Sequence, residues 1–141
     1  MIGVSIISRR TEQAVLALTR KARLAREHLH AATLQDCPAS IMDLAARVDR
    51  QMADGAKGPD GLEAVSDDIR QVIHGLSRIA QDDVKPVIID DESCMTALHE
   101  RLVPTYRAIL CSVAATALVE YLEALAAVTD ARRADALLKN L

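Results

Sequence analysis

Large aromatic side chains are nearly absent from this chain of 141 residues, which has no phenylalanine, no tryptophan and two tyrosines, Tyr106 and Tyr121. Hydrophobic residues make up 50% of the sequence, so any core has to be filled by leucine, isoleucine, valine and alanine. Small and branched aliphatic side chains suit closely packed helices better than a β-sandwich, in which aromatic residues are favoured. The composition therefore predicts an all-α protein.

Cysteine is also scarce. Cys37, Cys94 and Cys111 lie far apart, and no C-x-x-C motif is present. An odd number of dispersed cysteines argues for free thiols in a reducing compartment. The first residues, MIGVSIISRR, place their charges after a short apolar stretch, unlike a secretion signal. We therefore expect a cytoplasmic protein. Cys37 directly precedes a predicted helix, whose dipole would favour its thiolate.

The usual signatures of catalysis and cofactor binding are missing. The sequence contains no G-x-S-x-G, P-loop or G-x-G-x-x-G motif. Its four histidines include no pair at the spacing of helical metal ligands, and the carboxylate pair Glu120 and Glu123 has no second pair to complete a di-iron site. We therefore expect no cofactor, no metal and no catalysis.

Charge is unevenly distributed along a chain whose formal net charge is −3. Residues 1–35 carry a net charge of +4, residues 36–100 carry −8 and residues 101–141 carry +1. The basic segment would dock on acidic segments of the same fold or of a second subunit, or else bind nucleic acid or an acidic partner. The acidic net charge and the lack of interleaved aromatics weigh against nucleic acid. Arginine outnumbers lysine by 13 to 4, a bias typical of GC-rich bacteria and their phages.

The longest apolar stretch, ILCSVAATALVEYLEALAAV at 109–128, contains two charges, Glu120 and Glu123. A membrane-spanning helix needs about 20 residues without a charge that faces lipid, whereas the uninterrupted run covers the twelve residues 108–119. On a helical wheel the polar residues form a stripe about 80° wide, with apolar side chains around the rest. This pattern predicts the central helix of a bundle and no membrane span.

Apolar residues at spacings of three and four predict the remaining helices. They cover residues 8–34, 38–54, 60–83 and 90–104, with Pro104 ending or kinking the fourth, and a last short helix that begins at Thr129 or Asp130. The best candidate for a very short extended segment is at 87–89. We expect one domain, 1–141: a compact all-α bundle of five or six helices, three of them long.

Two of these helices carry narrow apolar seams at heptad spacing, which is typical of helix pairing. The seam residues are Val15, Leu18, Ala22, Ala25 and Leu29 in the first helix and Val65, Ile69, Val72 and Leu76 in the third. We expect these seams to bind another protein or a second copy of the chain, since closed two-fold dimers are the commonest soluble oligomers. The function predicted is non-catalytic: a regulator, chaperone, adaptor or inhibitor that acts through protein–protein contact.

Two other functions stay open. The segment RLAREH places Arg23 and His28 at R-x4-H, a spacing that resembles the signature of the HEPN ribonucleases, although the resemblance covers only these six residues. It implies an all-helical dimer in which the histidine serves in RNA cleavage. The two side chains lie about 140° apart on a helix, so a partner helix would have to complete the site. A bundle that holds an apolar ligand between its third and fifth helices is the other possibility.

Overall fold

Four helices make up the part of the chain that the structure describes. This computed structural model covers residues 2–54, 62–83 and 94–140, and the side chains of 9–53, 65–83 and 106–140. The helices are α1 (Ile2–Thr33), α2 (Ala39–Asp54), α3 (Leu62–Asp83) and α4 (Cys94–Lys139). The described ranges contain no strand, which confirms the all-α prediction.

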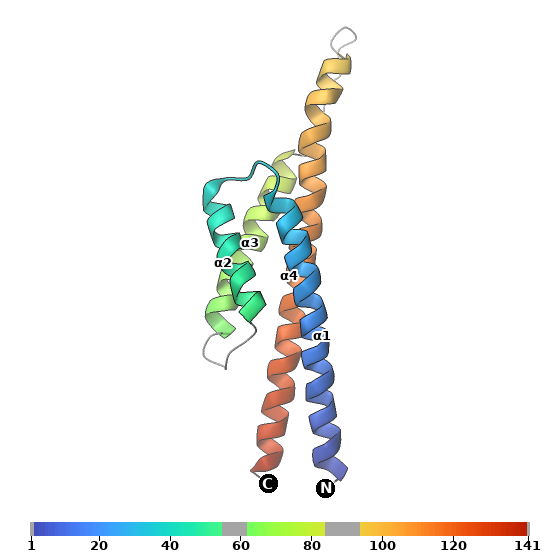
Figure 1. The fold of residues 1–141 in the computed structure, drawn as a ribbon, viewed down its shortest axis with the longest axis vertical. Coiled ribbons are helices and arrows are strands. Elements are labelled where there is room, and N and C mark those ends of the chain that lie inside the picture. Colours follow the sequence, from blue (N-terminus) through green and yellow to red (C-terminus); the bar gives the residue numbers. More distant parts are fainter. Residues whose placement is uncertain (1, 55–61, 84–93, 141) are drawn as a thin grey trace.

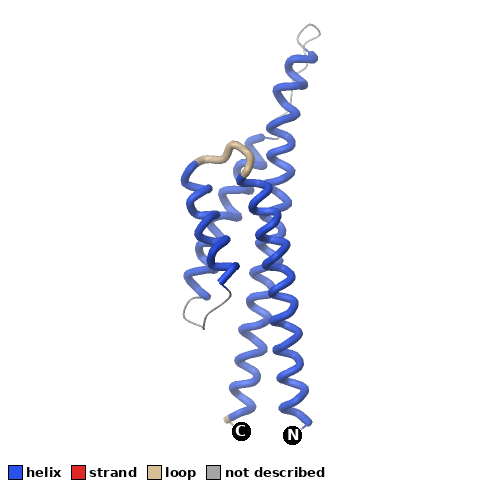
Figure 2. The backbone as a smooth tube through the Cα atoms, viewed as in Figure 1, coloured by secondary structure: helices blue, strands red, loops and turns tan. Residues whose placement is uncertain are grey.

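The two longest helices, α1 and α4, run antiparallel and bring both termini to the same end of the molecule (Figure 1). The shorter helices α2 and α3 form a hairpin that packs along one side of this pair (Figure 2). Beyond the hairpin, the first part of α1 and the last part of α4 continue as two helices alone (Figure 1). We call this extension the two-helix arm.

The described residues form four helices, so the prediction of five or six is wrong. The predicted fourth, fifth and last helices are one helix, α4, of 46 residues. The chain stays helical through Pro104, which removes only one backbone hydrogen bond of a long helix. Thr129, the expected cap of a new helix, instead donates its Oγ1 hydroxyl to the Leu125 carbonyl oxygen at 3.1 Å, as threonines inside helices do.

Other boundaries agree more closely with the sequence. The helix α2 begins after Pro38, whose carbonyl oxygen accepts hydrogen bonds from the Ile41 and Met42 amides at 3.0 and 3.1 Å. Both α2 and α3 end at the predicted residues, Asp54 and Asp83. The first helix begins earlier than predicted, at Ile2. The extended segment predicted at 87–89 lies outside the described residues.

The core is aliphatic and rich in alanine, as the lack of phenylalanine and tryptophan requires. The largest fully buried side chains come from all four helices: Leu29, Val48, Ile69, Val72, Leu76, Cys111, Leu118 and Val128. Ala25, Ala32 and Ala114 are also fully buried, so the helix backbones approach closely. A Cβ atom on Gly75 would lie 3.0 Å from Ile41 Cδ1, so α2 and α3 approach each other closely at this glycine.

Ion pairs link each helix to its neighbours around the bundle. They are Arg26–Asp49 between α1 and α2, Arg47–Asp68 between α2 and α3, Arg107–Asp83 between α3 and α4, and Lys21–Glu120 between α1 and α4. The basic first helix therefore pairs with acidic residues of its own chain, one of the arrangements that the charge pattern allowed. Such pairs contribute little stability where they are exposed.

The burial pattern of α4 predicts the result of two matched substitutions. Leu118 is fully buried, whereas Thr116 is exposed on the opposite side of the same helix. Leu118→Asp would bury an unpaired carboxylate and should lower the free energy of unfolding by about 4 kcal/mol or more. Thr116→Asp should change the free energy of unfolding of the single chain by about 0.5 kcal/mol or less. Urea unfolding followed by circular dichroism measures both, and equal midpoints would contradict this assignment of the faces.

Candidate functional site

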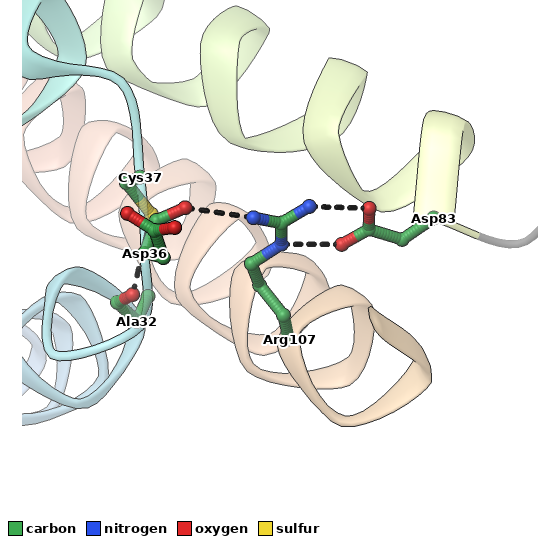
Figure 3. A network of polar contacts seen from close by, with 5 residues as sticks. All are labelled: Ala32, Asp36, Cys37, Asp83 and Arg107. Carbon is green, nitrogen blue, oxygen red and sulfur yellow. Dashed lines mark hydrogen bonds and ion pairs between the residues drawn. The ribbon is translucent and has the colours of Figure 1, made fainter. Parts of the chain in front are cut away.

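Arg107 joins three parts of the chain at the end of the bundle where α3 finishes (Figure 3). Its Nε and Nη2 groups each donate a hydrogen bond of 2.6 Å to the carboxylate of Asp83, which is the last residue of α3. Its Nη1 group donates to the Asp36 carbonyl oxygen, in the α1–α2 loop, at 2.7 Å. The Asp83 side chain is 8% exposed, so this bidentate pair is the best protected from water among the ion pairs of the described residues.

Two free thiols are buried beside this cluster. Cys37 lies in the α1–α2 loop, Cys111 lies on α4 one turn from Arg107, and the two thiols are within hydrogen-bonding reach of each other. Cys37 also donates its thiol hydrogen to the Ala32 carbonyl oxygen at 3.4 Å, which closes the loop onto the end of α1 (Figure 3).

Burial makes both thiols poor nucleophiles. It raises the pKa of Cys37, so the expected preference of the helix dipole for a thiolate does not prevail there. Burial, together with the neighbouring Cys37, raises the pKa of Cys111 to about 11. Both groups are therefore neutral near pH 7, and the cluster is suited to holding the loop and α4 together rather than to covalent chemistry.

The raised pKa of Cys111 predicts a loss of stability in alkali. The unfolded thiol ionises near its ordinary pKa of 9.0, whereas the folded thiol does so near 11. The contribution of this thiol should therefore be fully present below pH 9 and decline as the pH rises from 9 to 11. Comparing urea unfolding of the parent with that of Cys111→Ala at pH 7.5 and pH 10.5 isolates this contribution from those of tyrosine and lysine. A stability difference that is the same at both pH values would contradict the prediction.

Arg23 and His28, the residues of the R-x4-H motif, line different surfaces of α1. Arg23 borders a groove of about 670 Å³ between α1 and α2, together with His30 and Met52. His28 borders a separate groove of about 290 Å³ between α1 and α4. One chain therefore does not bring the two side chains together, and ribonuclease activity stays a prediction that needs residues from a second chain.

The predicted interaction seams lie inside the chain. Ala25, Leu29, Ile69, Val72 and Leu76 are buried in the core, and Leu18, Ala22 and Val65 pack against it. Val15 is half-buried. The chain thus covers with its own helices most of the apolar surface that the sequence analysis assigned to a partner, so a partner surface has to be sought elsewhere.

Such a surface lies on the side of the α1–α4 pair away from α2 and α3. The groove of about 290 Å³ there is lined by Leu24 and His28 of α1 and by Val113, Thr116 and Glu120 of α4, among others. Leu24 is 44% exposed and Val113 is 40% exposed.

The same surface continues along α4. Tyr106 and Ile109, which precede Val113 at the helical spacing of three and four residues, are 56% and 55% exposed. Glu120, which lines the same groove, pairs with Lys21 at 2.9 Å. We call this surface, with Leu24, Tyr106, Ile109 and Val113 as its apolar residues, the open face.

The helix α4 has more apolar side chains than the rest of the chain covers. Tyr106–Lys139 is, among the described residues, the one stretch that is long and apolar enough to cross a membrane by length and composition. Only 39% of its most apolar window is buried, so much of this apolar helix is left on the surface.

Two further features bear on the metal and ligand predictions. No group of three or more histidine, cysteine or acidic side chains among the described residues could hold a metal ion. The groove between α3 and α4, where the sequence analysis placed an apolar ligand, has a volume of about 730 Å³ and is lined by Arg70, Arg132 and Arg133 as well as by Leu122 and Leu125. It is a surface groove with a basic rim.

No protein-family model, curated protein or solved structure matches this chain. Its function is therefore argued from the surface of the molecule alone. Sequence reasoning missed both the Arg107 cluster and the open face. The isolated position of Arg107 before a long apolar run could have indicated the Arg107 cluster, since such an arginine needs an acidic partner near the core.

Proposed function

We propose that this chain is a non-catalytic helical protein that acts by binding another polypeptide chain through the open face. The observation that supports this proposal is the row of large apolar side chains at Tyr106, Ile109 and Val113, which are 40–56% exposed along one line of α4. Single exposed leucines are ordinary on protein surfaces, but a contiguous apolar row beside a groove is typical of interaction sites. A regulator, adaptor, chaperone or inhibitor would use such a face.

The surroundings that suit α4 are other helices and water rather than a membrane. Its apolar window includes Glu120, whose carboxylate pairs with Lys21 of α1 on the surface. Burying this pair in lipid would separate both charges from water at a high cost in free energy. The helix α4 packs against α1, which lies beside it on the open face, and against α3. We therefore propose a cytoplasmic protein of a bacterium or its phage, in which α4 is a bundle helix.

The location of the protein tests this part of the proposal. After expression in a bacterium, lysis and ultracentrifugation without detergent, the full chain should remain in the supernatant. The control is a fusion of residues 106–139 alone to a soluble carrier, which shows whether this stretch enters membranes when its partner helices are removed. Recovery of the full chain only in the membrane pellet, and its release only by detergent, would contradict the proposal.

The ribonuclease alternative makes a separate prediction. Because Arg23 and His28 line different grooves of α1, the purified protein should leave structured and unstructured RNAs intact over hours. Gel analysis of the RNA measures this, with His28→Ala as the control for contaminating nucleases. Cleavage by the parent that is lost in His28→Ala would replace the proposed function with an enzymatic one.

Photo-crosslinking tests the binding function. A photoreactive phenylalanine analogue at Ile109 lies on the open face, whereas the same analogue at Gln71 lies on the exposed surface of α3. In cells that express the protein, Ile109 should form crosslinks to a defined polypeptide, identified by mass spectrometry, and Gln71 should not. Equal crosslinking from both positions, or none from Ile109, would contradict binding through this face.

A further inference from the structure

The side of the α1–α4 pair that carries the open face has the dimensions of a helix-pair interface. The helix α1 has 32 residues, about 48 Å at 1.5 Å per residue, and two helices side by side are about 20 Å wide. This whole side covers on the order of 900 Å², close to the area of about 800 Å² that each partner buries in a complex of standard size, and the open face forms the part of it beside Tyr106 to Glu120 of α4. A second pair of long helices would cover it and complete a four-helix arrangement.

We infer that the occupant of the open face is a second copy of this chain, related by a two-fold axis that runs parallel to α1 and α4. The inference rests on the function proposed above and names its partner. This axis places α1 of each copy over α4 of the other, so each open face covers the other one. A two-fold axis across the helices would instead stack α1 on α1 and α4 on α4.

Lys21 and Glu120 favour the parallel axis. They pair at 2.9 Å across the contact between α1 and α4, so they lie at the same height along the face. With the axis parallel to the helices, Lys21 of each copy faces Glu120 of the other, and four charges of alternating sign meet. An axis across the helices at this height would bring Lys21 of one chain next to Lys21 of the other, and Glu120 next to Glu120. Like charges would then repel each other.

The apolar residues match in the same arrangement. Leu24 and Val113 border one groove from opposite helices, so they also lie at a common height. The parallel axis places Leu24 of the second copy over the groove beside Val113, as a knob enters a hole between facing helices. The apolar contact is therefore compatible with the two-fold axis that the charges of Lys21 and Glu120 favour.

The helix α4 offers a matched pair of substitutions to test this inference. Val113 is 40% exposed on the open face, and Val119 is 41% exposed on the same helix, about 120° away around its axis. Light scattering after size exclusion should give the parent protein, at micromolar concentration, twice its chain mass of 15.3 kDa. Val113→Glu and Leu24→Glu should each reduce the mass to that of one chain, and Val119→Glu should leave it doubled. Unchanged circular dichroism would show that all variants are folded.

Each other outcome overturns the inference. If the parent protein has the mass of one chain, the second copy is not the occupant of the open face. Crosslinks from Ile109 to a different protein would then still support the proposed function. A dimer that survives both Val113→Glu and Leu24→Glu uses another face. A dimer that Val119→Glu also dissociates is not specific to the open face. A single mass together with no crosslinks from Ile109 would refute both this inference and the function on which it rests.

Discussion

The rest of the structure depends on the close packing of α1 against α4. Alanines are buried on both helices, among them Ala25, Ala32 and Ala114, and they let two long helices lie side by side. An alanine buries little apolar area, so a helix pair of this kind gains less from the hydrophobic effect than one packed through leucine or phenylalanine. The pair therefore needs other helices against it, and the α2–α3 hairpin supplies them along only part of its length (Figure 1).

Polar contacts stabilise the end of the bundle where aromatic side chains would often fill the space. The Arg107 cluster joins the end of α3, the α1–α2 loop and α4 through three hydrogen bonds of 2.6–2.7 Å. Both oxygens of the Asp83 carboxylate accept hydrogen bonds from one guanidinium, a bidentate geometry that is stronger than a single neutral hydrogen bond. The loop is held in addition by Cys37, whose thiol contacts Ala32 and Cys111. A small set of short polar contacts thus fixes the connections that a narrow aliphatic core leaves loose.

The sequence predicted the helices with one strong apolar stripe better than the helix with several. In α2 and α3 the apolar residues lie on one side, so both helices and their ends could be read from spacing alone. In α4 they lie around most of the helix, and no spacing rule says which of them a neighbour covers. Pro104 and Thr129 suggested ends of helices because local preferences were weighed without the packing that overrides them.

The same limit explains why the seams predicted to bind a partner are mostly buried within the chain, while the open face was missed. A seam such as Ile69, Val72 and Leu76 shows that a helix needs a partner, but not whether that partner belongs to the same chain. Only the structure shows that α4 covers it. On α4 itself, Ile109 and Val113 were indistinguishable in sequence from Leu118, which is fully buried. Their exposure follows from the arrangement of the described helices: α2 and α3 cover one side of the α1–α4 pair, and the described residues include no helix over the other. The proposed binding function rests on this surface, which the described helices leave uncovered and which keeps large apolar side chains in register over about two turns of α4.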